Sequence, residues 1–263
     1  MSAATQAGHA AIAAALAPTA RRKGPALVAY LTAGFPRRAE FRRDLQRVAA
    51  HSELVEIGVP FTDPMADGMT IQRASHAALS QGVTLRWILE ELTAMTPRPP
   101  APLLLMSYLN PLLAYGLEQL PRAAQAAWVA GIIVPDLPLE ESTELMAALN
   151  GAGVALVQMV TPVTPPKRLA RLCAAAQGFV YAVTMTGTTG KNVAVPEELP
   201  RYLDRVKSLA TIPVCAGFGI RSREQVARLQ GHVDGVVVGS ALVETLERGE
   251  DPAAFLDSLR LAG

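Results

Sequence analysis

The sequence has little of what several classes of functional site require. It contains only two cysteines, Cys173 and Cys215, which lie far apart and outside any Cys-x-x-Cys pattern. Its four histidines lack the spacing of metal ligands. A disulfide framework and a structural metal are therefore not expected, and reduced thiols favour the cytoplasm. No apolar run is long enough to cross a bilayer, and the Ala-rich start has no basic residue before its apolar part, which argues against a secretory signal.

An excess of charge of either sign is also absent. The formal net charge is +1, so nothing in the balance favours nucleic acid as a partner. The basic run Arg21-Arg22-Lys23 is short, and we expect it to be the solvated end of a helix. Half of the residues are hydrophobic and 18% are charged, which excludes a disordered chain. With 263 residues and no shift of composition, the sequence predicts one domain over residues 1–263.

What the sequence does have is a regular alternation of short apolar runs and helical patterns. Runs without polar alternation are typical of parallel strands covered on both faces. Eight such units in roughly 250 residues predict a (β/α)8 barrel, preceded by a short extra helix over residues 9–16. A doubly wound open sheet is the alternative. The expected strands are 26–32, 54–58, 103–106, 131–134, 154–160, 179–184, 213–216 and 235–238. The expected helices that follow the first strand are 38–50, segments within 71–95, 117–130, 140–152, 165–176, 197–210, 223–230 and 252–261.

Two acids mark the stretch from residue 54 to residue 72. Glu56 stands inside an apolar run, where alternation puts it on the same face as Leu54 and Gly58. In a closed barrel that face is the interior, and a carboxyl there needs a partner or stays protonated. For Glu56 taken alone, a structural ion pair and a functional carboxyl are equally good interpretations. Asp67 lies in the following loop, before Gly68, and taken alone is best interpreted as a turn residue.

Barrels of this kind carry their active sites at the carboxyl ends of the strands. Tyr30, Tyr108 and Tyr181 all lie toward that end of three predicted strands, although core aromatics are common. Two glycine-containing loops, 216–220 and 238–241, follow the seventh and eighth strands. Such loops let backbone amides approach an oxyanion, and a helix that begins at Ser240 would direct its N–H groups at the same anion. The pair predicts a phosphate site without a dedicated Lys or Arg.

The stretch Glu56-Ile57-Gly58-Val59-Pro60-Phe61, with Asp63-Pro64, Ala66-Asp67-Gly68 and Ile71-Gln72, closely resembles the signature of the tryptophan synthase alpha chain family. The similarity extends over about residues 25–245. Further matching blocks are Tyr30-Leu31-Thr32-Ala33-Gly34, Leu105-Met106-Ser107-Tyr108-Leu109-Asn110-Pro111, Val134-Pro135-Asp136-Leu137-Pro138-Leu139-Glu140-Glu141, Thr186-Gly187-Thr188-Thr189-Gly190 and the two glycine loops. Phe35 departs from the family pattern, which usually has Asp there, and so does Lys191-Asn192-Val193 in the sixth loop.

The resemblance implies cleavage of indole-3-glycerol phosphate into indole and glyceraldehyde 3-phosphate, without cofactor or metal. It implies that Glu56 shuttles protons with a raised pKa, that ionised Asp67 accepts the indole N–H, and that Tyr181 supports the shuttle. The loop with Thr189 and Gly190 would be a lid, and Ile133, Met159 and Val237 would form apolar walls. The full set of expected substrate-binding residues is Tyr30, Tyr108, Ile133, Thr189, Gly190, Gly219, Val237, Gly239 and Ser240.

The resemblance also implies a β chain as partner in an α2β2 complex, docked on residues 60–64, 110–113 and 136–141. Three hypotheses stay open at this point. The chain is the alpha subunit of a two-component synthase, a stand-alone lyase that releases free indole, or a regulatory subunit without catalysis. Retention of Glu56 and Asp67 argues against the third, and the specific match of the second loop argues against another phosphate-binding barrel. Neither nucleic acid nor a membrane is expected as a partner.

Overall fold

A closed barrel of eight parallel strands forms the centre of the protein. The computed structural model describes residues 7–20, 22–184, 198–217 and 219–261. Each strand pairs with the next in the chain, and β8 pairs with β1, which closes the barrel. The strands are β1 (Ala26–Thr32), β2 (Leu54–Gly58), β3 (Leu103–Met106), β4 (Val129–Ile133), β5 (Ala155–Val160), β6 (Val180–Val183), β7 (Val214–Gly217) and β8 (Gly235–Val238). The prediction of a barrel is confirmed, and the open sheet is excluded.

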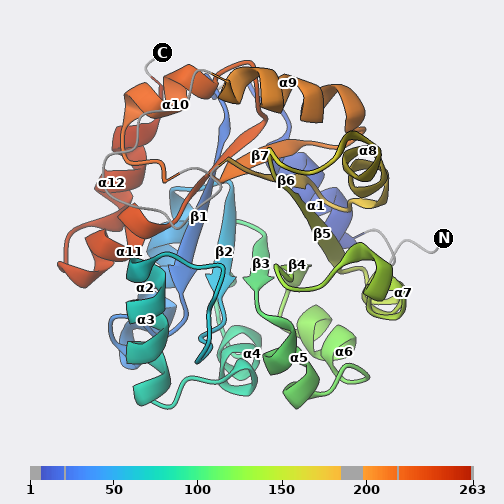
Figure 1. Ribbon diagram of the computed structural model, residues 1–263. Helices are drawn as coiled ribbons and strands as arrows, with labels where there is room; N and C mark the ends of the chain where they lie inside the picture. Colours follow the sequence, from blue (N-terminus) through green and yellow to red (C-terminus); the bar gives the residue numbers. More distant parts are fainter. Residues whose placement is uncertain (1–6, 21, 185–197, 218, 262–263) are drawn as a thin grey trace.

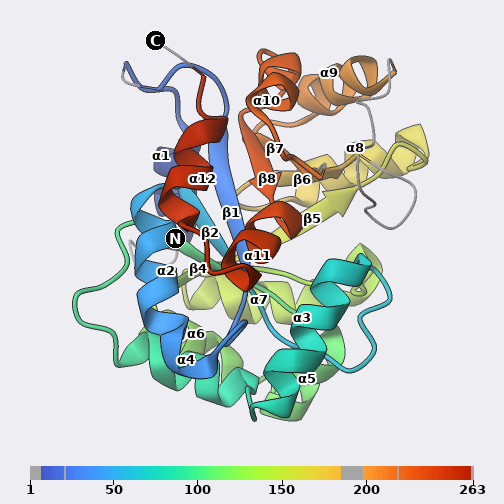
Figure 2. The same ribbon diagram turned by 90° about the vertical axis from the view of Figure 1, so that its left-hand side faces the viewer.

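Helices surround the strands on the outside, as Figures 1 and 2 show. The α-helices are α1 (Ala7–Leu16), α2 (Phe41–Ala50), α3 (Met69–Ser80), α4 (Leu85–Thr93), α5 (Leu109–Tyr115), α6 (Leu120–Ala126), α7 (Thr143–Gly151), α8 (Pro166–Ala175), α9 (Leu199–Leu209), α10 (Arg223–Leu229), α11 (Ser240–Glu247) and α12 (Pro252–Leu259). Two short 3-10 turns, η2 (Arg38–Glu40) and η3 (Leu139–Glu141), precede α2 and α7. The expected extra N-terminal helix is present as α1.

The predicted helix over 117–130 is wrong in its extent. Helix α6 ends at Ala126, and β4 already begins at Val129. Helix α5, in the third loop, is not predicted by the sequence pattern, although Pro111 lies in its first turn, where proline is tolerated. The segments expected within 71–95 form two helices, because Gly82 adopts a positive φ of 76° between them.

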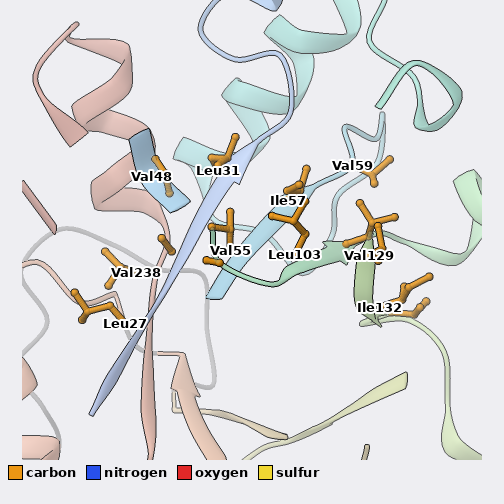
Figure 3. Packing of buried hydrophobic residues seen from close by; sticks show 14 of the residues in the cluster. Leu27, Leu31, Val48, Val55, Ile57, Val59, Leu103, Val129, Ile132 and Val238 are labelled. Carbon is orange, nitrogen blue, oxygen red and sulfur yellow. The ribbon is translucent and has the colours of Figure 1, made fainter. Parts of the chain in front are cut away.

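Two apolar cores lie on the two faces of the strands. The outer core packs between the strands and the helices, and includes Leu27, Val55 and Ile57; Figure 3 shows these side chains beside their neighbours. The inner core fills the barrel and includes Leu54, Leu104 and Val157. Leu54 and Val55 therefore face opposite ways, as strand alternation requires. Glu56 follows with its side chain directed inward, where it is 1% exposed.

Helix α1 closes the amino-terminal end of the barrel. Its Ile12 and Leu16 are fully or almost fully buried and belong to the inner core. The helix approaches the strands closely at Gly8, whose N–H donates to the Gly153 carbonyl at 2.8 Å. A Cβ at Gly8 would collide with the carbonyl oxygens of Ala130 and Gly153. Glycine is required at this position because the backbone of the helix itself makes the contact.

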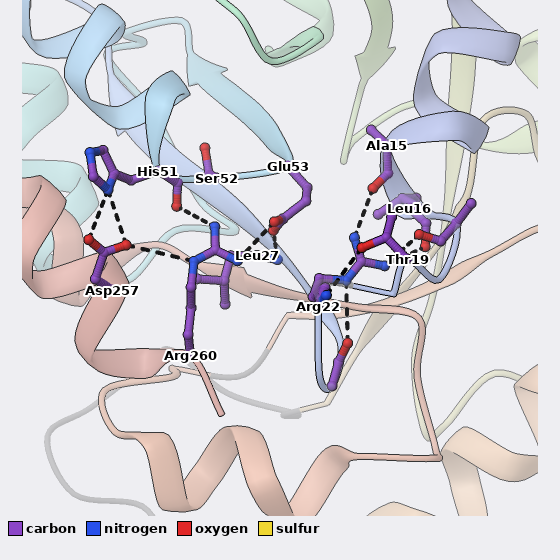
Figure 4. A network of polar contacts seen from close by, with 12 residues as sticks. Ala15, Leu16, Thr19, Arg22, Leu27, His51, Ser52, Glu53, Asp257 and Arg260 are labelled. Carbon is purple, nitrogen blue, oxygen red and sulfur yellow. Dashed lines mark hydrogen bonds and ion pairs between the residues drawn. The ribbon is translucent and has the colours of Figure 1, made fainter. Parts of the chain in front are cut away.

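Arginine side chains fasten this closed end, as Figure 4 shows. The Arg22 guanidinium donates to the carbonyls of Ala15, Leu16 and Ala17 at 2.8–3.1 Å, which satisfies the last acceptors of α1. Arg260, after α12, donates to Glu53 Oε1 at 2.8 Å. The other oxygen of Glu53 accepts from the Leu27 N–H of β1 at 2.7 Å. The end of the fold is thereby tied to the beginning of the barrel.

In the described part of the chain, no helix has both the length and the apolar character that a membrane span requires.

Candidate active site

A cavity of about 420 Å³ opens at the carboxyl end of the strands, opposite α1. Strands, the loop after β2 and the loops after β7 and β8 all contribute to its lining. The expected site residues that line it are Tyr30, Glu56, Asp67, Tyr181, Gly219, Val237, Gly239 and Ser240. The fold therefore brings together side chains that are spread over most of the sequence.

Glu56 lies at the inner wall of this cavity, between Tyr30 on β1 and Leu104 on β3 in the strand register. Both carboxyl oxygens are buried, and neither has a hydrogen-bond partner among the described residues. Burial raises the pKa of the Glu56 carboxyl to about 8, and the negative charge of Asp67 adds to this effect. Glu56 is therefore not a structural ion pair, and at neutral pH it retains its proton.

Asp67 is held by contacts on its side chain and on its backbone. Its Oδ2 accepts a hydrogen bond from the Tyr108 hydroxyl at 3.2 Å, and that hydroxyl accepts from the Ala66 N–H at 2.8 Å. The Gln72 side chain donates to the Asp67 carbonyl at 2.8 Å. Burial raises the pKa of the Asp67 carboxyl to about 6, against the opposing effect of the Tyr108 hydrogen bond. At neutral pH Asp67 is ionised, while Glu56 beside it is not.

Two tyrosines flank the acids, and each lies over a glycine of the next strand. The ring of Tyr30 occupies the space in which a Cβ at Gly58 would stand, and a Cβ at Gly217 would lie 2.5 Å from Tyr181 Cε1. Side chains at positions 58 and 217 would push the rings out of place. Burial raises the pKa of both hydroxyls well above the ordinary value, with Asp67 as a further cause for Tyr30 and Glu56 for Tyr181. Both hydroxyls are therefore hydrogen-bond donors at neutral pH.

The opposite wall of the cavity is made of backbone. Gly239 precedes α11, whose first residue is Ser240, and both line the cavity. The first N–H groups of a helix have no acceptor within the helix, so they are available to an anion. Gly219 has a positive φ of 33°, and no heavy atom of another described residue lies within 4 Å of the position of a Cβ. The arrangement is compatible with a phosphate group, and the assignment of these residues stays a prediction.

Some expected residues do not line the cavity. Ile133 is fully buried in the inner core, paired with Met106 and Val157 in the register, and Pro135 takes its place at the cavity wall. The expectation that Ile133 forms a wall of the site therefore stays a prediction. Tyr108 also lies outside the lining and contacts Asp67 instead. Thr189 and Gly190 lie outside the described residues.

The structure adds residues that the sequence patterns did not indicate. Met106 and Ile71 line the cavity beside the expected Met159. A polar bridge connects three segments at the opening of the cavity. Arg221, after β7, donates twice to the Glu244 carboxylate of α11 at 2.8 and 2.9 Å, and Thr70 of α3 donates to the same carboxylate at 3.1 Å. The bridge ties the helix that follows the Asp67 loop to the glycine loops. Nothing in the local sequence signals it, because the three residues come from separate segments.

Across the described ranges, no group of three or more His, Cys, Asp or Glu side chains is placed to hold a metal ion. The chemistry that the site offers is proton transfer by two carboxyls whose pKa values differ. Such a pair supplies an acid and a base at the same pH.

Comparison with known proteins agrees with this geometry. A family model described as tryptophan synthase alpha chain matches residues 16–260. A curated tryptophan synthase alpha chain from Nitratidesulfovibrio vulgaris is 44% identical over 233 residues, which cover 88% of this chain and 91% of the relative. One from Bacillus mycoides is 46% identical over 198 residues, which cover 75% and 77%.

Solved structures give the same result. A chain of tryptophan synthase from Mycobacterium tuberculosis is similar with a TM-score of 0.83 at 32% identity, covering 100% of both chains. The tryptophan synthase subunit alpha from Legionella pneumophila is similar with a TM-score of 0.81 at 30% identity, covering 90% of this chain and 92% of the other.

Proposed function

The chain belongs to the tryptophan synthase alpha chain family, and from that premise we propose that the Glu56–Asp67 cavity cleaves indole-3-glycerol phosphate. The activity of this family is the activity of the chain: a lyase reaction of tryptophan biosynthesis that yields indole and glyceraldehyde 3-phosphate. The observation that carries the assignment to the cavity is the pair of buried carboxyls, one protonated and one ionised at neutral pH.

The cleavage is a retro-aldol step, and each acid has one task in it. Glu56 delivers its proton to C3 of the indole ring. The resulting carboxylate then takes the proton of the glycerol hydroxyl as the carbon–carbon bond breaks, which restores the acid. Asp67, held by Tyr108, accepts the indole N–H while positive charge develops on the ring. Proton transfer by such positioned groups contributes about 10²–10⁴-fold to a rate. Tyr181, beside Glu56, supports the proton transfer by positioning the substrate.

The rest of the cavity holds the two ends of the substrate. Met106, Met159 and Val237 contribute apolar surface for the ring. Gly219, Gly239 and Ser240 supply backbone N–H groups for the phosphate, in agreement with the use of these two loops in barrels of this class. Thr189 and Gly190 complete the proposal as the lid of the sixth loop.

We infer that the partner of the chain is the tryptophan synthase β chain, because the relatives are named as the alpha chain of tryptophan synthase. We place its docking face on residues 60–64, 110–113 and 136–141. Met65 and Leu113, which lie beside or within two of these segments, are 86% and 50% exposed. Apolar side chains of this size on a surface favour a protein interface. The stand-alone lyase is not favoured, because the relatives carry the name of a subunit.

Two further assignments are part of the proposal. The chain works in the cytoplasm, which is supported by the two free and buried cysteines. Residues 1–263 form a single domain, which is supported by one barrel built from strands along almost the entire chain.

The decisive experiment measures indole release from indole-3-glycerol phosphate by the purified chain, with and without a β chain. We expect Glu56→Gln and Asp67→Asn each to lower the rate at least about 100-fold. The control is Glu90→Gln, the same change at an exposed acid of α4, which should leave the rate unchanged. Near-normal release by either site variant would overturn the assignment. A full rate without the β chain, with no increase upon its addition, would restore the stand-alone lyase.

A further inference from the structure

A second cavity, of about 300 Å³, lies on the outer side of the strand wall. It is enclosed by the loop after β4, by β5 and by α8, and it lies next to the catalytic cavity. Pro135 and Met159 line both cavities. One layer of residues therefore separates the two spaces. A volume of this size is at the lower end of the range for small-molecule sites.

The outer cavity is lined by an amide side chain that has no hydrogen-bond partner among the described residues. On β5, Val157 and Met159 face the barrel interior, so Gln158 faces outward, where its neighbours Leu156 and Val160 belong to the outer apolar core. Gln158 is only 5% exposed and lines the cavity. Its side chain makes no hydrogen bond to any described residue. Its amide atoms are not among the fully buried polar atoms that lack a partner, so the amide is a donor and an acceptor that can be reached from the cavity.

The charges around the cavity are already matched. Arg168, at the rim, donates to both oxygens of Glu140 at 2.7 and 3.0 Å, and Arg171 lies 3.5 Å from the same carboxylate. Asp136 accepts from the Leu109 N–H at 2.9 Å. Both arginines thus contact the single carboxylate of Glu140, and Asp136 is bound by a backbone N–H, so each of these charged groups already has a partner. The cavity is suited to an uncharged ligand.

The remaining lining is largely apolar and includes Leu137, Leu139, Leu156 and Leu172. Thr164 is the polar exception, and its hydroxyl is already hydrogen-bonded to Thr161. Leucine and proline walls with one amide suit a neutral, flat ring that carries a single hydrogen-bond donor. Indole has this composition, since its N–H can donate to the Gln158 carbonyl oxygen. It is also released on the other side of the Pro135–Met159 wall.

We propose that the outer cavity is a second, non-catalytic binding site for indole and neutral heterocycles of its class. The evidence for the site is the geometry of the cavity around Gln158. The choice of indole as its ligand rests on the proposed function. A ligand there contacts Pro135 and Met159 from behind. The product therefore binds against the same two side chains that line the catalytic cavity.

The test is equilibrium dialysis of the intact chain against radiolabelled indole, with crystals soaked in 5-bromoindole to locate the bromine. We expect two indole molecules for each chain and a bromine peak in each cavity. Gln158→Leu keeps the size of the side chain but removes the amide, and should weaken the second binding step at least about fivefold. The control is Gln125→Leu, the same change at an exposed glutamine of α6, which should retain both sites.

A second variant guards against a folding defect in Gln158→Leu. Leu139→Trp fills the outer cavity from its half-buried rim and should likewise remove one indole. One indole for each chain in the unmodified protein, or two in both variants, would overturn the proposal. Indole release from indole-3-glycerol phosphate is measured on the same samples. A chain that releases indole but binds it only in the catalytic cavity would refute the outer site and leave the proposed function intact.

Discussion

The two ends of the barrel interior are built from the same eight strands, but they differ in whether their key polar groups have hydrogen-bond partners. At the closed end, the last carbonyls of α1 are satisfied by Arg22, and apolar side chains such as Ile12 fill the space. At the open end, Glu56 is buried to the same degree, yet neither of its oxygens has a partner in the described part of the chain.

The difference shows that the open end is less stable because it keeps a group suited to proton transfer. At the end that only closes the fold, the last carbonyls of α1 have partners. The ring nitrogen Nε2 of His9 is buried there without a partner, but burial lowers the pKa of this histidine, which favours its uncharged form. An unpaired carboxyl is kept at the end that holds the cavity, although its burial costs free energy. A raised pKa is the direct result, and it is the property that a proton shuttle needs near neutral pH. The following changes test this contrast.

The largest expected effect is a gain of stability from Glu56→Gln at high pH. The Glu56 pKa is about 8 in the folded chain against an ordinary value of 4.5. Between these values the folded state binds more protons than the unfolded state, so this group makes stability fall as pH rises from 4.5 to about 8. Each unit of pKa difference corresponds to about 1.4 kcal/mol. The free energy of unfolding of the variant should therefore exceed that of the parent by several kcal/mol above pH 8, and by little near pH 4.5.

Urea unfolding at pH 5, 7 and 9 measures this difference. Glu90→Gln, at an exposed position, serves as the control and should follow the parent at every pH. A constant gap between Glu56→Gln and the parent would show that the open end does not hold an unpaired, titrating carboxyl.

A smaller loss of stability is expected at the closed end from Gly8→Ala. The added methyl meets the carbonyl oxygens of Ala130 and Gly153, so α1 must shift, at a cost of about 1–3 kcal/mol. The rate of cleavage for each folded molecule should not change, because α1 is remote from the cavity. Gly151→Ala is the control, since a Cβ there has no neighbour within 4 Å. Thermal unfolding and the indole assay are measured together, and a lower rate without a loss of stability would contradict the separation of the two ends.

The smallest effect is expected at the open end, from Tyr108→Phe. In the parent, kcat/KM should rise through about pH 6 as Asp67 ionises and fall through about pH 8 as Glu56 loses its proton. The Tyr108 hydroxyl lowers the pKa of Asp67, so its loss should move the acidic limb upward. The rate at neutral pH should fall about tenfold, on the scale of one charge-assisted hydrogen bond. Tyr115→Phe, on α5, is the control, and an unmoved acidic limb would argue against the contact with Asp67.

The barrel could be predicted from the sequence because its strands are short, continuous apolar runs, and Glu56 could be predicted because it interrupts one of them. The depth of Ile133 in the barrel could not be predicted in the same way. Alternation gives the face of a residue but not its depth in the barrel, which depends on the stagger between strands. Ile133 faces the barrel interior, as alternation predicts, while Pro135 lines the cavity.

Contacts between separate segments could not be predicted from the sequence for a related reason. The bridge from Arg221 through Glu244 to Thr70 needs three elements in their final positions. The free amide of Gln158 depends on a space left between β5, α8 and the loop after β4. Neither arrangement leaves a local pattern, because packing decides whether a polar side chain finds a partner.

The seat of α1 has a consequence for the order of assembly. The helix precedes every described strand in the chain, so it emerges from the ribosome before them. Its contacts at Gly8, however, are with Ala130 and Gly153, which lie near the middle of the sequence and beyond it. During synthesis its docking site at Gly8 is incomplete until β4 and the segment before β5 have appeared. Helix α1 therefore completes its docking only after about half of the chain has been synthesised, when the amino-terminal end of the barrel has formed.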